Sequence, residues 1–552
     1  MRRSLRFISI AAALMLVLGF SMRQARTQSM SCFVSTVNGA IQGVDRGASC
    51  AFLGVPYGAS TAGARRWRPP QPADSWAPAI LNATAAPNCP GFNAATGLPQ
   101  GSEDCLKLII WAPDPLPATP APVLIWLHPG AFVAASANLA AANGQRFAEE
   151  TGTIVVAANY RLGAFGFLAH PALSNEDPTY PSSGNFGLLD QRAAFAWVRD
   201  HIAAFGGDPD RVTIVGSSAG ALSVGLHLVS PGSGGLFHRA IMQSGLPTIR
   251  WRTREDAEQQ GEQFAAALGC VDPAQVVTCL RTRTRDQVLN ALPIGSDQVL
   301  EGQRVQWSPV VDGVELPDQP RTLLENGAFA RVPLMIGTNR DEGWVYVDRS
   351  FPGGLTAEQY DTTLATDFGA DAAAVASMYG TPEGATPEEA AARRKDVLAA
   401  IVGDAEYVCE ARRVARLVER TATPVFAYSF EYDIDSVAVD RVIHGLEYNL
   451  LFGNNFGAPS NYVLTDADRE LFRAMAGYWS RFAAQATPNL DDDAVVHWPA
   501  FKHPSGQGRG SDKHLVLDAP IREGMRLDEP ACNFWEPYFL RTLTGAVPAS
   551  AP

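Results

Sequence analysis

The sequence lacks an excess of basic residues. Its 44 Lys and Arg are outnumbered by 57 Asp and Glu, which gives a formal net charge of −13 at pH 7. Binding to nucleic acid or to an anionic lipid surface draws on positive charge, because released counterions supply much of the affinity. We therefore expect no nucleic-acid partner and interpret the acidity as a solubility feature.

The sequence also lacks the hydrophobic excess of a multi-span membrane protein. Its mean hydropathy is close to zero, and the 46% hydrophobic and 18% charged residues are ordinary for a globular protein. We expect no stable membrane span in the mature chain. At 552 residues the chain has ample material for a large core.

No Cys-x-x-Cys pair occurs, so the sequence offers no zinc-type spacing and predicts no metal site. The eight cysteines form an even set, which is typical of disulfide-bonded proteins in an oxidising compartment. Eight cysteines allow about 105 connectivities. Short separations favour Cys89 with Cys105 and Cys270 with Cys279, and leave four to be divided: Cys32, Cys50, Cys409 and Cys532.

The N-terminus has the three-part pattern of a secretory signal. Arginines at positions 2, 3 and 6 precede an apolar stretch from Phe7 to Phe20, and a polar segment follows through Ser29. No clear Ala-x-Ala cleavage motif follows the apolar stretch. We expect residues 1–28 to be a signal peptide and the protein to be secreted or periplasmic; the arginines at 23 and 26 leave an uncleaved anchor as the alternative.

Internal repeats, charge runs and low-complexity linkers are absent, which favours one domain over residues 29–552. Apolar, β-branched segments alternate with helix-length stretches such as Gly187–Ala204, and this alternation predicts an α/β fold with a doubly wound, mostly parallel sheet and helical insertions. Its active site is expected at the carboxyl ends of the strands. The predicted strands are Val123–His128, Thr153–Ala158, Val212–Val215, Ala240–Gln243, Val332–Gly337 and Val425–Phe430.

Two segments depart from this alternation. Residues Phe33–Pro56 favour short antiparallel strands with glycine turns. The alanine-rich stretch Thr356–Ala400 favours helices and is a candidate insertion over the site.

Gly216-Ser217-Ser218-Ala219-Gly220 follows the predicted strand ending at Val215 and precedes a helix-compatible stretch. This is the context of a Gly-x-Ser-x-Gly nucleophile elbow, in which the central serine occupies a strained turn and its flanking residues must be small. The pentapeptide makes Ser218 the candidate nucleophile.

A serine nucleophile needs a histidine and an orienting carboxylate, which follow it in the order acid then histidine in this type of fold. His444 is the best placed of the downstream histidines; the others are His497, His503 and His514. Asp341 and Glu342 both come just after a predicted strand, and spacing alone leaves the choice between them open.

Backbone N–H groups must also stabilise the oxyanion of the tetrahedral intermediate. Pro129-Gly130-Ala131 follows the strand ending at His128, where the elbow fold places its second donor loop. Gly130, Ala131 and Ala219 are the predicted donors, whereas Pro129 has no N–H to give.

These motifs occur together with further segments that resemble the type-B carboxylesterase and cholinesterase-like family over nearly the whole mature chain. The matching segments are Ala51–Tyr57 (AFLGVPY), Arg68–Pro72 (RPPQP), Glu103–Leu106 (EDCL), Asn159–Arg161 (NYR), Gly184–Gln191 (GNFGLLDQ), Ala203–Pro209 (AAFGGDP), Ser230–Ser233 (SPGS) and Gln243–Gly245 (QSG). The resemblance implies an α/β-hydrolase fold and the hydrolysis of small carboxylic esters through an acyl-enzyme, without a cofactor.

The resemblance also assigns residues. It implies Ser218 as nucleophile, Glu342 rather than Asp341 as acid, and His444 as base. Ser244 is then a supporting hydroxyl near the acid, and Glu447 supports the histidine. The family's disulfide pattern implies three pairs and leaves Cys32 for Cys50; the three are Cys89–Cys105, Cys270–Cys279 and Cys409–Cys532. By family position alone, Val305, Gln306 and Trp307 line the acyl side.

Three departures from the family pattern bear on substrate choice. Ser217 stands where the family usually has glutamate, Pro129-Gly130-Ala131 replaces a glycine triplet, and the loop between Cys89 and Cys105 lacks the tryptophan of cholinesterases. Without that anion and that aromatic platform, a quaternary ammonium group loses two of its partners. We therefore expect neutral esters to be preferred over choline esters.

Two other functions compete with this interpretation. An interfacial lipase needs an exposed apolar lid, and the alanine-rich Thr356–Ala400 does not decide the matter. A non-catalytic cholinesterase-like binding protein loses triad residues, whereas Ser218, Glu342 and His444 are all present. The sequence makes no prediction of oligomeric state.

Overall fold

The computed structural model describes residues 32–93, 96–292, 307–380, 382–434, 440–454, 463–490, 496–502, 512–525 and 527–543. The predicted signal peptide, 1–28, lies outside these ranges, as do Val305, Gln306 and His503. Within the ranges, no helix is both long enough and apolar enough to cross a membrane.

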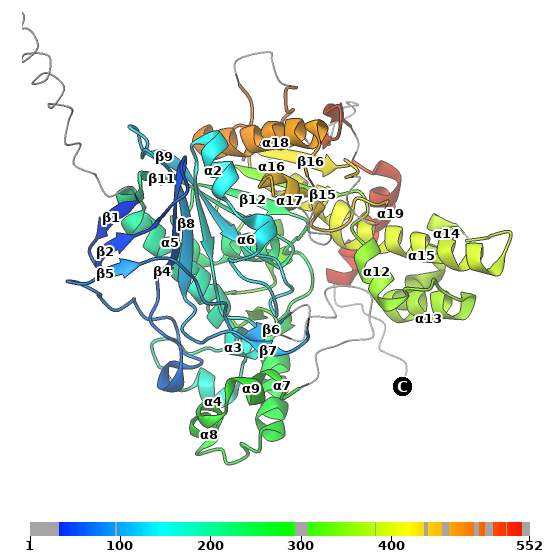
Figure 1. The fold of residues 1–552 in the computed structure, drawn as a ribbon. Coiled ribbons are helices and arrows are strands. Elements are labelled where there is room, and N and C mark those ends of the chain that lie inside the picture. The colour runs from blue at the N-terminus through cyan, green and yellow to red at the C-terminus, as the bar shows by residue number, and fades with distance from the viewer. Residues whose placement is uncertain are drawn as a thin grey trace, which may run out of the picture.

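An eleven-stranded mixed sheet forms the centre of the described chain, and its middle strands are parallel (Figure 1). The strands in spatial order are β18 (Arg522–Gly524), β17 (His514–Leu517), β16 (Val425–Phe430), β15 (Leu334–Asn339), β12 (Arg239–Gln243), β11 (Gly207–Ser217), β9 (Ala121–Leu127), β10 (Ile154–Ala158), β8 (Lys107–Pro113), β4 (Ser49–Pro56) and β3 (Val44–Asp45). All six strands predicted from apolar runs are present in this sheet. The doubly wound α/β prediction is confirmed.

The predicted strands form because their side chains are buried on both faces of the sheet. The five residues of β10 read IVVAA and are all buried, which is typical of a central parallel strand. Strand β11 begins at Gly207, earlier than the predicted Val212, and its pairing with β9 shifts register between these two residues.

Helices cover both faces of the sheet, as Figure 1 shows. Helices α5 (Phe186–His201), α6 (Ala219–Val229) and α16 (Cys409–Glu419) pack on one face and share its core. On the other face lie α2 (Gln145–Thr151), α17 (Leu446–Leu451) and α18 (Asp466–Gln485). Connecting segments of the described chain carry the helices α3 (Gly163–Phe167), α4 (Pro171–Ser174), α7 (Arg254–Ala267), α8 (Val276–Thr282), α9 (Arg285–Leu289) and α11 (Pro320–Glu325).

A third core lies beside the sheet. Helices α12 (Trp344–Ser350), α13 (Ala357–Phe368), α14 (Ala372–Tyr379) and α15 (Pro387–Gly403) pack against a short π-helix, η6 (Asp404–Val408), and against α19 (Glu529–Leu543). The predicted helical insertion Thr356–Ala400 falls in this group, which projects from one side of the molecule in Figure 1. The assignment of residues 29–552 to one domain stays a prediction.

The N-terminal strands are short and antiparallel, as predicted. Strands β1 (Phe33–Thr36) and β2 (Gly39–Gln42) pair antiparallel, as do β3 and β4, while β5 (Ile80–Asn82) joins β2 in parallel. Two small two-stranded sheets complete the described strands: β6 (Gly91–Phe92) with β7 (Pro99–Gln100), and β13 (Arg252–Thr253) with β14 (Val310–Val311).

Four disulfides staple the described chain, and they are the pairs that the resemblance implied. They join Cys32 to Cys50, Cys89 to Cys105, Cys270 to Cys279 and Cys409 to Cys532. Disulfides persist in oxidising compartments. Asp114 lies near Cys32 and Cys50, but those two sulfurs are bonded to each other and offer no thiolate to a metal ion.

Candidate active site

The nucleophile elbow lies at the end of β11, at the centre of the sheet. Ser218 follows the strand directly and precedes α6, with φ 54° and ψ −125°, a backbone conformation that L residues rarely adopt. A Cβ on Gly216 would lie 2.4 Å from the backbone of Gly220, and one on Gly220 would lie 2.0 Å from the carbonyl oxygen of Leu127. The tight turn therefore requires both glycines and presses the elbow against the end of β9.

His444 and Glu342 contact each other at the end of β15, two strands away from β11 in the sheet. Glu342 follows β15, His444 precedes α17, and Glu342 Oε2 lies 2.6 Å from His444 Nδ1. Glu342 is fully buried, and 11% of the His444 side chain is exposed. Because Nδ1 is held by the carboxylate, Nε2 is the nitrogen left to act on a substrate or a nucleophile.

Asp341 contacts the same loop but not the imidazole. Its N–H donates to Val442 O at 2.9 Å, and its Oδ2 accepts from Val442 N at 2.8 Å. The two carboxylates that spacing could not separate thus have different partners: Asp341 fixes the backbone before the histidine, and Glu342 contacts the ring. Of the other candidate histidines, His497 is exposed and His514 lies within β17.

The predicted donor loop is tightly wound. Gly130, Ala131 and Phe132 all have positive φ, at 119°, 50° and 60°, and Gly130 O accepts from the N–H groups of Val133 and Ala134. Within the described ranges, the N–H groups of Gly130, Ala131 and Ala219 make no hydrogen bond to another residue. Such uncommitted donors are what an oxyanion hole requires.

His128, the residue before this loop, is held by contacts with Tyr160 and Pro129. His128 stacks on Tyr160 with ring centroids 4.3 Å apart, and the Tyr160 hydroxyl donates to His128 O at 2.8 Å. Burial lowers the pKa of His128 to about 4, so its ring is neutral at pH 7. Its Nδ1 lies 2.8 Å from Pro129 O, which accepts a hydrogen bond from it and orients the ring against the donor loop.

A buried carboxylate lies behind the elbow. Glu447 Oε1 accepts from Ser217 Oγ at 3.3 Å and from Gln243 Nε2 at 3.4 Å, while its Oε2 accepts from Asn339 Nδ2 at 2.7 Å. Burial, followed by the nearby Glu342 carboxylate, raises the pKa of Glu447 to about 7. Glu447 therefore connects the ends of three neighbouring strands and is partly protonated near neutral pH.

Two tyrosines pack against the imidazole. The ring centroid of Tyr407, on η6, lies 5.1 Å from that of His444, and the centroid of Tyr346, on α12, lies 5.4 Å away. The Tyr407 hydroxyl donates to that of Tyr346 at 2.7 Å. The insertion thus supplies an aromatic wall beside the histidine.

Sequence reasoning did not single out Asn339, Gln243 or the two tyrosines. Asp341 and Glu342 do mark this strand end in the sequence, but the asparagine before them carries no comparable signal. Ser244, expected near the acid, has φ 54°, and its buried hydroxyl bonds no described residue. Trp307, expected on the acyl side, is buried edge-on against Phe264 with centroids 5.4 Å apart.

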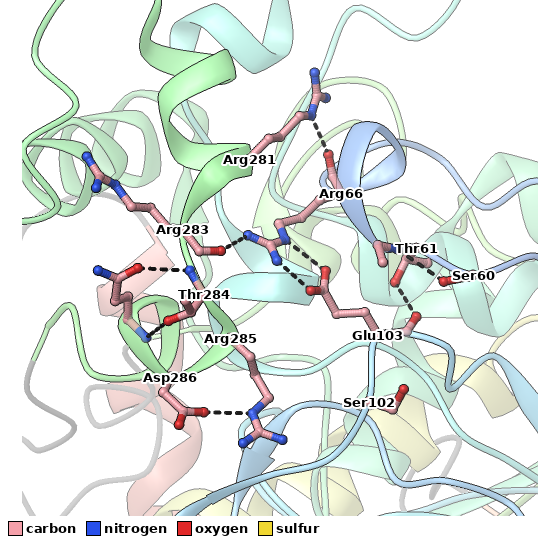
Figure 2. Close-up of polar contacts among 12 residues, drawn as sticks. Ser60, Thr61, Arg66, Ser102, Glu103, Arg281, Arg283, Thr284, Arg285 and Asp286 are labelled. Carbon is pink, nitrogen blue, oxygen red and sulfur yellow. Dashed lines mark hydrogen bonds and ion pairs between the residues drawn. The ribbon is translucent and has the colours of Figure 1, made fainter.

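Arg66, which lies outside the loop closed by Cys89 and Cys105, forms an ion pair with Glu103 within that loop. Figure 2 shows its guanidinium between the Glu103 carboxylate, at 2.5 and 2.8 Å, and Arg283 O at 2.7 Å. The aromatic residue in the described part of this loop is Phe92, which is half-buried against the core.

Comparison with known proteins agrees with this geometry. The sequence model of the Carboxylesterase family matches residues 30–535. The chain belongs to the carboxylesterase family. Among its relatives is Cholinesterase from Mus musculus, which is 32% identical over 550 residues, covering 92% of this chain and 87% of that protein. Membership in the carboxylesterase family makes the protein a carboxylic ester hydrolase with an ester substrate.

Proposed function

We propose that the protein is an exported serine carboxylesterase that works through an acyl-enzyme, with Ser218 as nucleophile, His444 as general base and Glu342 as the orienting acid. The observation that carries this proposal is the 2.6 Å contact between Glu342 Oε2 and His444 Nδ1. It lies at the carboxyl edge of the sheet that also ends in the strained Ser218 elbow.

In the first half-reaction, His444 Nε2 takes the proton of Ser218 Oγ as this oxygen bonds to the ester carbonyl carbon. The charge that develops on the carbonyl oxygen is stabilised by the N–H groups of Gly130, Ala131 and Ala219. The bond to the alcohol oxygen then breaks, and His444 gives its proton to that leaving oxygen. Water repeats the sequence on the acyl-enzyme and releases the acid.

Each donor is fixed before the substrate arrives. Gly130 O caps its own turn through the N–H groups of Val133 and Ala134, and α6 begins at Ala219, so the Ala219 N–H has no partner in its own helix. Removing one such donor typically costs about 10²–10³ in kcat.

Neutral esters are the proposed substrates. Ser217 places a neutral, fully buried hydroxyl beside the nucleophile, and Phe92 in the loop from Cys89 to Cys105 packs on the core. The Glu447 carboxylate, which contacts Ser217 behind the elbow, is buried and partly protonated near neutral pH. At these two positions a quaternary ammonium group therefore lacks the exposed anion and the aromatic platform that would bind it.

The catalytic proposal is tested with a serine-directed phosphonate and Ser218→Ala. Wild-type enzyme should lose activity as one phosphonyl group is attached to Ser218, and Ser218→Ala should hydrolyse p-nitrophenyl butyrate at least about 10⁴-fold more slowly at unchanged Tm. A Ser218→Ala protein with full esterase activity overturns the assignment.

The substrate proposal needs a matched pair of esters. Butyrylcholine and 3,3-dimethylbutyl butyrate have the same shape and differ in the charge of the alcohol. We expect kcat/KM for the neutral ester to equal or exceed that for the choline ester; a large preference for choline contradicts the proposal. Export is tested by sequencing the N-terminus of protein recovered outside the cytoplasm, which should begin between residues 21 and 30.

A further inference from the structure

Asn339, the last residue of β15, contacts the proposed acid, the backbone just before the proposed base and a side-chain carboxylate just after it. Its backbone N–H donates to Glu342 Oε1 at 2.6 Å, while Glu342 Oε2 contacts His444. Its side-chain amide donates to Ile443 O at 2.7 Å and to Glu447 Oε2 at 2.7 Å. Ile443 immediately precedes the histidine, and Glu447 follows it by one turn.

We propose that Asn339 is a positioning residue for catalysis, which sets the orientation of His444 by bonding Glu342, Ile443 and Glu447 at once. The inference rests on the proposed function of the Ser218, Glu342 and His444 side chains. Asn339 touches no reacting atom; it acts through the acid that orients the imidazole and through the backbone that carries it.

The environment of Asn339 makes its amide hard to replace. The residue is 1% exposed, so water cannot take over the two donors, and an unmet acceptor in such a place costs stability. An amide NH₂ has two hydrogens, and here they serve two acceptors. A carboxylate or an alkyl group of the same size serves neither.

The same amide also affects the charge balance around the base. Asn339 bonds the carboxylates of Glu342 and Glu447. Glu342 in turn contacts the His444 imidazole, and both carboxylates interact with the Tyr428 hydroxyl, on β16. Burial and the two carboxylates raise the pKa of Tyr428 above its ordinary value, so this hydroxyl is neutral. The hydrogen bond from Asn339 favours the ionised form of Glu447, against the burial that raises the pKa of that group.

Asn339→Asp is the isosteric test, because it keeps the backbone donor to Glu342 and removes both side-chain donors. We expect kcat per active site to fall about hundredfold with KM changed less than about threefold, since misplacing a catalytic group by about 1 Å has that effect. The added carboxylate should also move the acid limb of the kcat/KM profile to higher pH. Active sites are counted by phosphonate labelling of Ser218.

A swapped pair separates positioning from plain structural damage. In Asn339→Asp/Glu447→Gln the amide and the carboxylate exchange places, so one donor–acceptor contact is restored with the same number of carboxylates. We expect this double variant to recover about tenfold in kcat over Asn339→Asp.

Asn185→Asp is the matched control. Asn185 is likewise a fully buried asparagine with a hydrogen-bonded amide. Its two ends bond the backbone of Val310, through Val310 N and Val310 O, and no hydrogen bond within the described ranges joins it to the three proposed catalytic residues. This variant should lower Tm and leave kcat per labelled site within about twofold of wild type.

Three results overturn the inference: kcat per labelled site within about threefold of wild type for Asn339→Asp, no recovery in the swapped pair, or an equal loss of kcat in Asn185→Asp. Failure of the proposed function has a different signature. In that case Ser218→Ala retains turnover, whatever the Asn339 variants do.

Discussion

Ser217 Oγ lies 3.3 Å from Glu447 Oε1, so the residue before the nucleophile donates a hydrogen bond to a carboxylate that follows the histidine. The contact joins β11 to α17 across the carboxyl edge of the sheet. In the family pattern, position 217 usually carries a glutamate. Here that glutamate would lie beside Glu447 in a fully buried space, and the two carboxylates would repel each other. The hydroxyl avoids this repulsion.

Ser217→Glu should move the acid limb of the kcat/KM profile to higher pH, by up to about one unit. The added negative charge stabilises the protonated histidine, although a proton shared between the introduced carboxylate and Glu447 reduces the effect. Matched pH profiles of the wild type, Ser217→Glu and the neutral control Ser217→Ala measure the shift. Coincident profiles for all three would contradict it.

Glu447→Gln should change how stability depends on pH. The pKa of Glu447 is about 7 in the folded chain, above the 4.5 of an ordinary glutamate, so folding favours its protonated form. Below about pH 4.5 both states are protonated; as pH rises to 7 the unfolded chain ionises first, and the folded state loses stability on the order of 3 kcal/mol.

Glu447→Gln removes this loss, so its free energy of unfolding relative to wild type should increase between about pH 5 and pH 8. Urea unfolding at the two pH values measures the change. Glu470→Gln, on the exposed face of α18, should show no such trend. A wild-type-like pH dependence in Glu447→Gln would be inconsistent with a buried, protonated Glu447.

Ala131→Gly should stabilise the protein by about 0.5–1 kcal/mol, because Ala131 has φ 50°, where a Cβ is strained and glycine is not. It also removes a methyl group beside the proposed oxyanion site, so esters with bulky acyl groups should gain more in kcat/KM than acetates. The control Ala266→Gly, at an exposed position in α7, should cost about 1 kcal/mol. A loss of stability in Ala131→Gly would show that the loop is unstrained.

Tyr407→Leu should lower kcat/KM about tenfold and shift the acid limb to lower pH, because the protonated imidazole loses an aromatic partner 5.1 Å away. Tyr407→Phe keeps the ring and should stay within about twofold of wild type. Tyr360→Leu, in the same helical core, should lower Tm alone. Equal kcat/KM values and pH profiles for Tyr407→Leu and Tyr407→Phe would show that the aromatic ring does not contribute to catalysis.

The sheet and the elbow were predictable because their signals are local. The run Ile154–Ala158 is apolar at every position, and the glycines at 216 and 220 are required by contacts within one turn or with the adjacent strand. The same holds for the family resemblance, which rests on short ordered segments.

The environment of Asn339 was not predictable from spacing. Its side-chain acceptors are 104 and 108 residues further along the chain, and nothing local distinguishes it from a turn asparagine. The π-helix was missed for a related reason: Asp404–Val408 continues an alanine-rich helical pattern, and the wider turn is defined by its packing against α12 and α19. The Ser244 hydroxyl, which bonds no residue within the described ranges, likewise follows from strand-end geometry that a motif does not encode.

The disulfide between Cys409 and Cys532 links the last described helix to the segment that packs against His444. Cys409 is two residues beyond Tyr407, and its partner, 123 residues away, lies in α19. The turn that supports the imidazole is therefore tethered covalently to the last described helix. A chain cut before Cys532 would keep all three proposed catalytic side chains and still lose the restraint on one of them, so a lesion remote in sequence would act as an active-site defect.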